Sequence, residues 1–167
     1  RVECLSSKDW LIRSEKMGPE PLDQSFTVDQ FRKGLGASQS PVRSWLLDQR
    51  RIAGIGNIYA NEALYLARIH PKRRASTIRR TEAMALLENI RQVLQGAIRA
   101  GGTTLRDYRT AEGREGKYAK RLCVYGRDGE ACARCGGEIG RIVFGGRSAF
   151  YCANCQPARG PAHVYRP

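Results

Sequence analysis

Two Cys-x-x-Cys pairs constrain this chain more than any other feature of its sequence. The pairs are Cys132-Ala-Arg-Cys135 and Cys152-Ala-Asn-Cys155, and sixteen residues separate them. Each pair forms a knuckle that points two sulfur atoms at one place, and a hairpin between the pairs can bring the knuckles together. Four thiolates in a tetrahedron suit zinc and leave no open coordination position. The spacing therefore predicts one structural, non-catalytic Zn²⁺ on a small β-hairpin.

Disulfides and redox chemistry are the alternatives for these cysteines. Residues 1–17 lack the pattern of a secretory signal, which favours metal over a disulfide framework. A redox Cys-x-x-Cys normally opens a helix after a strand, and neither pair has that context. Two pairs of reduced thiols would leave the short hairpin with little to hold it together. Cys4 and Cys123 have no partner at ligand spacing, so we predict that both are small buried hydrophobic residues.

The hairpin between the two pairs carries a basic residue at its turn. Gly145-Gly146 separates two apolar segments, which predicts strands over 141–144 and 149–151 with Arg147 at the tip. An arginine held there can enter a groove or bind a phosphate, whereas the alternative is a solvated turn residue. Because the zinc clamp would fix the hairpin rigidly, we favour the functional interpretation.

Net charge points to the class of partner. The chain has 167 residues, enough for one domain or two small ones, and its 29 Lys and Arg against 16 Asp and Glu give a net charge of +13. An excess of this size favours an acidic partner, above all nucleic acid, although a merely soluble basic domain is the alternative. With 41% hydrophobic residues the chain is not a disordered tail. Its apolar runs are too short to cross a membrane.

Residues 27–100 have the periodicity of a helical bundle. A capping box at Thr27 starts the first helix, Ser40 and Pro41 start the second as N-cap and first helical residue, and Thr81 caps the last. Pro71 and the pair Gly101-Gly102 are breakers. The predicted helices are 27–35, one from 40 that includes Trp45 to Leu47, 57–67 and 81–100. The last has one apolar face: Leu86, Leu87, Ile90, Val93, Leu94, Ala97 and Ile98.

A Gly-x-Gly turn, Gly54-Ile-Gly56, opens the third predicted helix. Such a turn can present backbone N–H groups and the positive end of the helix dipole to a phosphate, and Asn57 as N-cap could donate its amide. A plain turn explains the glycines equally well. The motif is not a dinucleotide fingerprint, because no third glycine follows it. Helix, turn, Gly-x-Gly turn and helix is, however, a recurrent way to grip a DNA backbone.

Softer signals lie elsewhere in the chain. The run 72–80 has five basic residues, which are either a solvated helix start or a patch that contacts a nucleic-acid backbone. His70 is better explained as a helix-end residue than as a ligand. The segment 103–118 is polar and long for a loop, and loops of this length are usually functional or disordered. We also expect a strand over 121–125.

Four blocks of the sequence resemble the formamidopyrimidine-DNA glycosylase / endonuclease VIII family. In the family's order they are LLDQRRIAGIGNIYANEALYLARIHP, AIRAGGTTLRDY, VYGRDGEACARCGGEI and GGRSAFYCANCQ. The resemblance implies a mainly α fold, a helix–two-turn–helix bundle followed by a Cys4 zinc β-hairpin. It implies the DNA-gripping C-terminal half of a base-excision repair DNA glycosylase and AP lyase acting on oxidised purines. Its partner would be damaged or abasic double-stranded DNA.

The resemblance also assigns roles to residues. Asn57, beside Gly56, matches an asparagine that contacts phosphates flanking the lesion, and Arg147 matches the finger arginine that contacts the lesion phosphate and assists elimination. Arg43 stands where the family usually has a lysine near the phosphates, which keeps the charge but alters the geometry. The four cysteines match zinc ligands. The loop that closes over an everted purine corresponds to Thr103, Leu105, Arg106, Asp107 and Tyr108.

One feature of the family is missing from this sequence. The family's nucleophile is an N-terminal proline with a glutamate beside it, in a preceding β-sandwich domain, whereas this chain begins with Arg1. Three hypotheses follow: part of a longer or split glycosylase whose catalytic domain is separate, a truncated non-catalytic damaged-DNA-binding protein, or a module recruited to bind RNA in a larger assembly. We expect an intracellular, DNA-associated protein, in the cytoplasm or nucleoid if bacterial or in an organelle. The expected division is 1–26 as a domain remnant or linker, 27–120 as the DNA-binding domain, 121–156 as the finger and 157–167 as a flexible tail.

Overall fold

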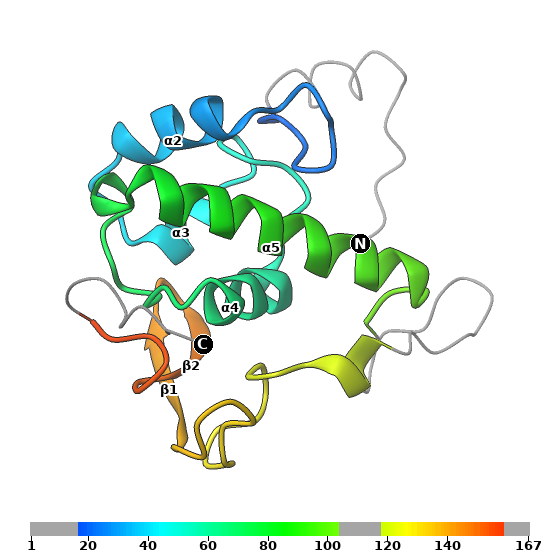
Figure 1. Ribbon diagram of the computed structural model, residues 1–167, viewed down its shortest axis with the longest axis vertical. Coiled ribbons are helices and arrows are strands. Elements are labelled where there is room, and N and C mark those ends of the chain that lie inside the picture. The colour runs from blue at the N-terminus through cyan, green and yellow to red at the C-terminus, as the bar shows by residue number, and fades with distance from the viewer. Residues whose placement is uncertain (1–16, 104–117, 159–167) are drawn as a thin grey trace.

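The fold is mainly helical, with one small β-hairpin, as the sequence predicts. A computed structural model describes residues 17–103 and 118–158 of the chain. In Figure 1, α5 crosses the helical part between α2 and α4, and the hairpin packs against α4. The elements in order are α2 (Val28–Gly36), α3 (Val42–Leu46), α4 (Asn57–Leu66), η1 (Ala75–Thr77), α5 (Arg80–Arg99), η2 (Tyr118–Arg121), β1 (Ile139–Phe144) and β2 (Arg147–Cys152).

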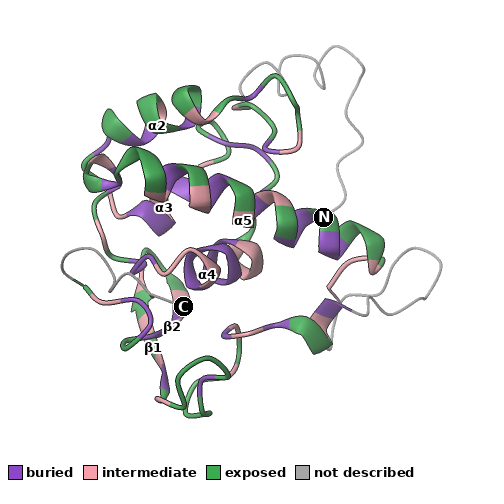
Figure 2. Ribbon diagram, viewed as in Figure 1, coloured by how far each residue is buried: buried purple, intermediate pink, exposed green. Residues whose placement is uncertain are grey.

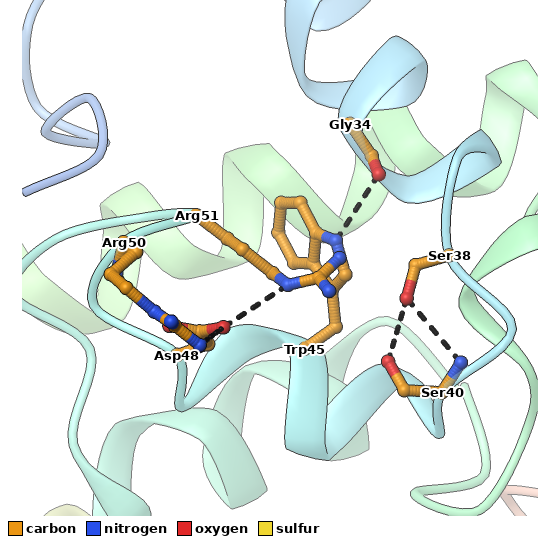
Figure 3. Close-up of polar contacts among 7 residues, drawn as sticks. All are labelled: Gly34, Ser38, Ser40, Trp45, Asp48, Arg50 and Arg51. Carbon is orange, nitrogen blue, oxygen red and sulfur yellow. Dashed lines mark hydrogen bonds and ion pairs between the residues drawn. The ribbon is translucent and has the colours of Figure 1, made fainter.

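The helical core forms where α5 packs on α2 and α4. Phe31 and Trp45 meet edge to face with their ring centroids 5.5 Å apart, and the Trp45 indole N–H donates to the Gly34 carbonyl at 3.1 Å (Figure 3). The buried faces of the helices point toward one another (Figure 2). Six of the seven residues predicted on the apolar face of α5 are buried. The prediction was wrong for Ile98, which is 67% exposed because Ala97, one position before it, takes the packed side of the helix.

Three of the four predicted helix starts differ from the structure. The capping box at Thr27 is confirmed, with its hydroxyl accepting from the Gln30 N–H at 3.3 Å. Ser40 is not the N-cap of α3; its hydroxyl bonds that of Ser38 at 2.7 Å (Figure 3), and Pro41 takes the N-cap position. The Val42 N–H, first in α3, donates to the Arg73 carbonyl at 2.7 Å. A neighbouring loop therefore satisfies the start of this helix in place of a side chain.

The starts of α4 and α5 are also shifted by one or two residues. Gly56, not Asn57, is the N-cap of α4, and Asn57 is its first helical residue. Helix α5 begins at Arg80 with Arg79 as N-cap, so Thr81 lies inside it. The Arg79 N–H donates to the Glu82 carboxylate at 2.9 Å, which satisfies one of the free N–H groups at this end.

The ends of these two helices differ in kind. Helix α4 ends at Leu66, one residue before the predicted end at Ala67. The chain turns at Arg68, which has a left-handed φ of 58°, ahead of the predicted breaker Pro71. Helix α5 ends before Gly101 and Gly102, both at positive φ, as the sequence predicts.

The hairpin is the predicted one, with longer strands. Strands β1 and β2 pair antiparallel from Ile139 opposite Cys152 to Phe144 opposite Arg147. Gly145 and Gly146 form the turn at φ values of 59° and 70°. Residues 121–125 do not form the expected strand, because a carboxylate on α4 binds their N–H groups.

Several predictions fall on residues outside the described ranges. They concern 1–16, including Cys4, the loop over 104–117 and the tail from 159. Among the helices of residues 17–103 and 118–158, none has the length and apolar character needed to cross a membrane.

Candidate nucleic-acid interface and zinc centre

The four predicted ligand cysteines meet at one place. All four sulfur atoms lie within 4.8 Å of one another, with Cys135 exposed and the other three buried. The Sγ–Sγ distance is 3.5 Å between Cys135 and Cys152 and 3.9 Å between Cys132 and Cys155. A tetrahedron with Zn–S bonds of about 2.3 Å requires about 3.8 Å between sulfurs, so the donor set and its spacing fit zinc. The four cysteines form the site of one structural Zn²⁺.

The second knuckle is fastened to the helical domain by a buried amide side chain. Gln156 accepts the Cys152 N–H at 3.0 Å and donates to the Ile69 carbonyl, beyond the end of α4, at 2.8 Å. Nearby, the buried His70 ring packs edge to face on Tyr151 at 4.7 Å, and its Nδ1 accepts the Lys72 N–H. His70 is therefore a packing residue beyond the end of α4 rather than the predicted helix-end residue, and burial lowers its pKa.

Arg43 joins the helices to the hairpin. It comes from α3, is only 1% exposed, and donates through Nη2 to the side-chain oxygen of Asn57 and, at 2.7 Å, to the Ser148 carbonyl. Asn57 donates to the same carbonyl at 3.2 Å. The ring of Phe144 lies 4.9 Å from the guanidinium carbon. Arg43 Nε is buried without a hydrogen-bond partner, so this charge is not fully satisfied within the described parts of the chain.

A hollow of about 280 Å³ opens beside this buried arginine. Its lining brings two arginines from distant segments together: Arg43, Ser44, Leu47, Asp48, Phe144, Gly145 and Arg147. Burial lowers the pKa of Arg43, and the nearby positive charge of Arg147 lowers it further. Two like charges at one partly buried hollow favour an anion there.

The Gly-x-Gly turn positions the start of α4 beside this hollow. Gly54 needs glycine because its φ is +77°, and its N–H donates to the Gln49 side chain at 2.8 Å. That N–H is therefore not free for a phosphate, contrary to a simple interpretation of the motif. Gly56 is exposed at the N-cap, and helix geometry leaves the first N–H groups of α4 without intrahelical partners.

Asp48, which lines the hollow, also binds two exposed arginines. Its carboxylate accepts from Arg50 Nε at 2.9 Å and from Arg51 Nε at 3.2 Å (Figure 3). Hydrogen bonding to Arg50, with help from Arg51, lowers the pKa of Asp48 to about 2. The carboxylate is thus ionised at neutral pH and neutralises part of the charge of these two arginines.

Sequence reasoning missed two polar residues in the middle of α4. The Glu62 carboxylate accepts the N–H groups of Cys123, Val124 and Tyr125 at 2.7 to 2.9 Å, and it is 2% exposed. Asn61, also buried, accepts the Phe150 N–H at 2.9 Å. The signal was present, since Asn-Glu interrupts an otherwise apolar helix and buried polar groups need partners.

Three other predictions have a structural outcome. Cys123 is half-buried and packs against the edge of the finger core rather than inside it. The basic run 72–80 forms a turn, η1 and the first residue of α5, and Arg73 is bound there to Glu82. Of the predicted lesion loop, Thr103 is described, with its hydroxyl 3.1 Å from that of Tyr59. Its other members, 105–108, lie outside the described residues.

Fold and site together define a helix–two-turn–helix protein with a Cys4 zinc finger. The H2TH domain of formamidopyrimidine-DNA glycosylase matches residues 17–109, and the zinc finger found in FPG and IleRS matches residues 129–158. The chain belongs to the formamidopyrimidine-DNA glycosylase H2TH family, as its sequence motifs indicated.

Individual relatives agree with this assignment. The chain is 44% identical to the formamidopyrimidine-DNA glycosylase of Shewanella loihica and 48% identical to that of Heliobacterium modesticaldum, covering 52% and 51% of their lengths and 85% and 84% of its own. It therefore spans about half the length of these curated relatives. The structure of MutM (Fpg) from Thermus thermophilus superposes with a TM-score of 0.85 at 41% identity, over 93% of this chain and 59% of that one. The structure of Lactococcus lactis Fpg in complex with abasic-site DNA superposes with a TM-score of 0.83 at 39% identity. The match covers 92% of this chain and 57% of that one.

Proposed function

We propose that this chain grips double-stranded DNA through its phosphate backbone, as the DNA-binding part of a base-excision repair glycosylase. The observation that carries the proposal is the hollow where Arg43 of α3 and Arg147 of the hairpin converge. Asn57 lies in hydrogen-bond contact with Arg43 at the start of α4. A phosphate there would relieve the repulsion between the two guanidinium groups and bind Arg147 by charge-assisted hydrogen bonds.

The charge of the whole chain supports the same partner. A net charge of +13 favours association with a polyanion, and backbone contacts dominate such binding. Structures of the related Lactococcus lactis Fpg hold DNA containing an abasic site or a formamidopyrimidine lesion. We propose the same substrate class here: damaged or abasic duplex DNA, with Gly56 and Asn57 at the backbone and residues 103–108 closing over the base.

This function divides the chain into working parts. Residues 27–120 would bind the DNA backbone, 121–156 would place Arg147, and 1–26 and 157–167 would be accessory segments. The glycosylase and AP lyase steps on oxidised purines would use a catalytic domain in addition to these parts, with Arg147 assisting elimination. Such a role places the chain with DNA inside the cell, in the cytoplasm or nucleoid if bacterial, or in an organelle.

The direct test is DNA binding by Arg147→Ala as a function of salt. Fluorescence anisotropy with a duplex that carries an abasic-site analogue measures the dissociation constant from about 50 to 200 mM salt. We expect about 10- to 100-fold weaker binding, because a charge-assisted contact is lost, and a salt slope smaller by about 1. Zinc should stay bound, since Arg147 is not a ligand.

Arg32→Ala is the matched control. It removes the same charge from an exposed position on α2, a different element from those that line the hollow. We expect the dissociation constant to change by less than about threefold, because a surface charge away from the hollow contributes little at these salt concentrations. Equal losses in the two variants would overturn the assignment of the hollow. A flat salt dependence of the wild-type chain would overturn backbone binding itself.

Trapping with borohydride tests the catalytic part of the proposal. That reagent reduces a Schiff base between a protein amine and an abasic sugar to a permanent bond. We expect no adduct from this chain alone under conditions where it binds the duplex. An adduct would show that an amine of this chain performs the lyase step and would overturn the need for a separate catalytic domain.

A further inference from the structure

Tyr65 connects the zinc site to the helix that carries Asn57. It is the ninth of the ten residues of α4, is 3% exposed, and places its hydroxyl oxygen 3.2 Å from Cys132 Sγ. A cysteine that binds zinc is a thiolate and has no proton to donate. In the zinc-bound protein the Tyr65 hydroxyl must therefore be the donor and the sulfur the acceptor.

The tyrosine is held in place from the zinc knuckle itself. Arg134, which lies between Cys132 and Cys135, stacks its guanidinium carbon 4.4 Å from the centre of the Tyr65 ring. It also donates to the Tyr65 carbonyl at 3.1 Å. Ring, carbonyl and hydroxyl of one residue thus all contact the first knuckle, which fixes the direction of the hydroxyl.

Charge at the metal centre explains what this contact can do. Four thiolates and one Zn²⁺ carry a formal net charge of about −2. Three of the sulfurs are buried, so this charge is poorly solvated and gains from each hydrogen-bond donor near a sulfur. Tyr65 supplies such a donor from outside the finger, and Arg134 adds a positive charge beside it.

We propose that Tyr65 is a positioning residue of the zinc site, and that its hydrogen bond to the Cys132 thiolate couples zinc binding to helix α4. Asn57 begins the same helix and lies at the Arg43 hollow. Because a helix of ten residues is stiff, zinc holds one end of it while the other end faces the proposed phosphate site. By thermodynamic linkage, any contact that strengthens the packing of α4 on the finger also raises the affinity of the four cysteines for zinc.

The test is zinc affinity in Tyr65→Phe, measured by competition with a coloured zinc chelator. Phenylalanine keeps the ring under Arg134 and removes only the hydroxyl, so the fold should be retained at saturating zinc. We expect about tenfold weaker zinc binding, the lower range for loss of a partner that hydrogen-bonds a metal ligand. The thiols should also be alkylated faster at equal, sub-saturating zinc.

Tyr151→Phe is the control, since it removes the same phenol hydroxyl from strand β2 of the finger. Tyr151 packs on His70, and its hydroxyl forms no hydrogen bond to a sulfur atom within residues 17–103 and 118–158. We expect its zinc affinity to stay within twofold of wild type. A zinc affinity of Tyr65→Phe within twofold of wild type, or equal losses in both variants, would overturn the proposal.

A second readout follows the coupling into DNA binding, and this part rests on the proposed function. At limiting zinc, Tyr65→Phe should bind the abasic duplex more weakly than wild type, and saturating zinc should restore it. A deficit that persists at saturating zinc would refute coupling through the metal. If the wild-type chain bound no DNA, the proposed function would fail, while the chelator competition would still decide the role of Tyr65.

Discussion

Glu62 is the residue on which the position of the finger depends most directly. Its Oε1 accepts the N–H groups of Val124 and Tyr125, both at 2.9 Å, and its Oε2 accepts that of Cys123 at 2.7 Å. The carboxylate is almost fully buried, so water cannot replace these bonds. Glu62→Gln keeps the shape of the side chain but replaces one acceptor oxygen by an NH₂ donor.

The cost of this change can be worked from the contacts. If the amide oxygen keeps the bonds to Val124 and Tyr125, the NH₂ group faces the Cys123 N–H, so donor meets donor at about hydrogen-bond distance. One charge-assisted bond is lost and at least one buried N–H is left without a partner, about 1 to 3 kcal/mol. The two remaining bonds weaken because the acceptor is now neutral. We expect Glu62→Gln to lower the free energy of unfolding by about 3 kcal/mol in total, a large share of the stability of a typical domain.

Urea denaturation at saturating zinc measures this loss, and hydrogen exchange locates it. The amides of Cys123, Val124 and Tyr125 should exchange faster in Glu62→Gln, while the core of α5 should change less. Glu130→Gln is the control: Glu130 pairs with Arg127 on the surface and is 55% exposed, so we expect a change below about 1 kcal/mol. A Glu62→Gln protein within about 0.5 kcal/mol of wild type would refute the argument that buried N–H groups need this acceptor.

Two further predictions concern Asp48 and the metal ligands. The pKa of Asp48, lowered to about 2 from an ordinary 3.8, means that its ionised form stabilises the fold above about pH 4 and that this stabilisation is lost as pH falls through 2. Asp48→Asn should therefore lower Tm by about 1 to 3 °C at pH 7, and the difference from wild type should vanish near pH 2 in thermal scans; a constant difference across this range would contradict the ion pairs. Cys152→Ser should lose zinc and make residues 129–158 sensitive to protease while 17–103 stay folded, because metal and finger fold together. Cys123→Ser should keep one zinc per chain, and full zinc retention by Cys152→Ser would refute the ligand assignment.

The finger could be predicted from the sequence because its signals are local. Two Cys-x-x-Cys pairs and the turn Gly145-Gly146 lie within 24 residues and leave few arrangements open. The structure lengthened the strands but did not move the turn or the ligands. The apolar face of α5 was predicted for the same reason, since a 3.6-residue periodicity can be seen within the sequence of one helix.

The helix starts were harder because their partners come from elsewhere in the chain. Ser40 has the right side chain for an N-cap, yet the carbonyl of Arg73 satisfies the first N–H of α3. At α5, Glu82 binds both the Arg79 N–H and the Arg73 side chain, so the capping carboxylate also closes a loop. Local helix propensity cannot predict such bonds. A tertiary hydrogen bond and a local N-cap contribute similar free energies, so the tertiary bond can replace the local cap.

The role of Arg43 depends on contacts that sequence periodicity cannot show. Arg43 and Ser148 are 105 positions apart, yet the Ser148 carbonyl accepts from both Arg43 and Asn57. A buried arginine with an unpaired Nε is costly, so it persists only where surrounding contacts fix it. Here those contacts come from Phe144 and Ser148 of the hairpin, and Arg147 immediately precedes Ser148. Any displacement of the finger must therefore move Arg147 and release Arg43 together, which makes the helices and the zinc hairpin one binding unit rather than two independent ones.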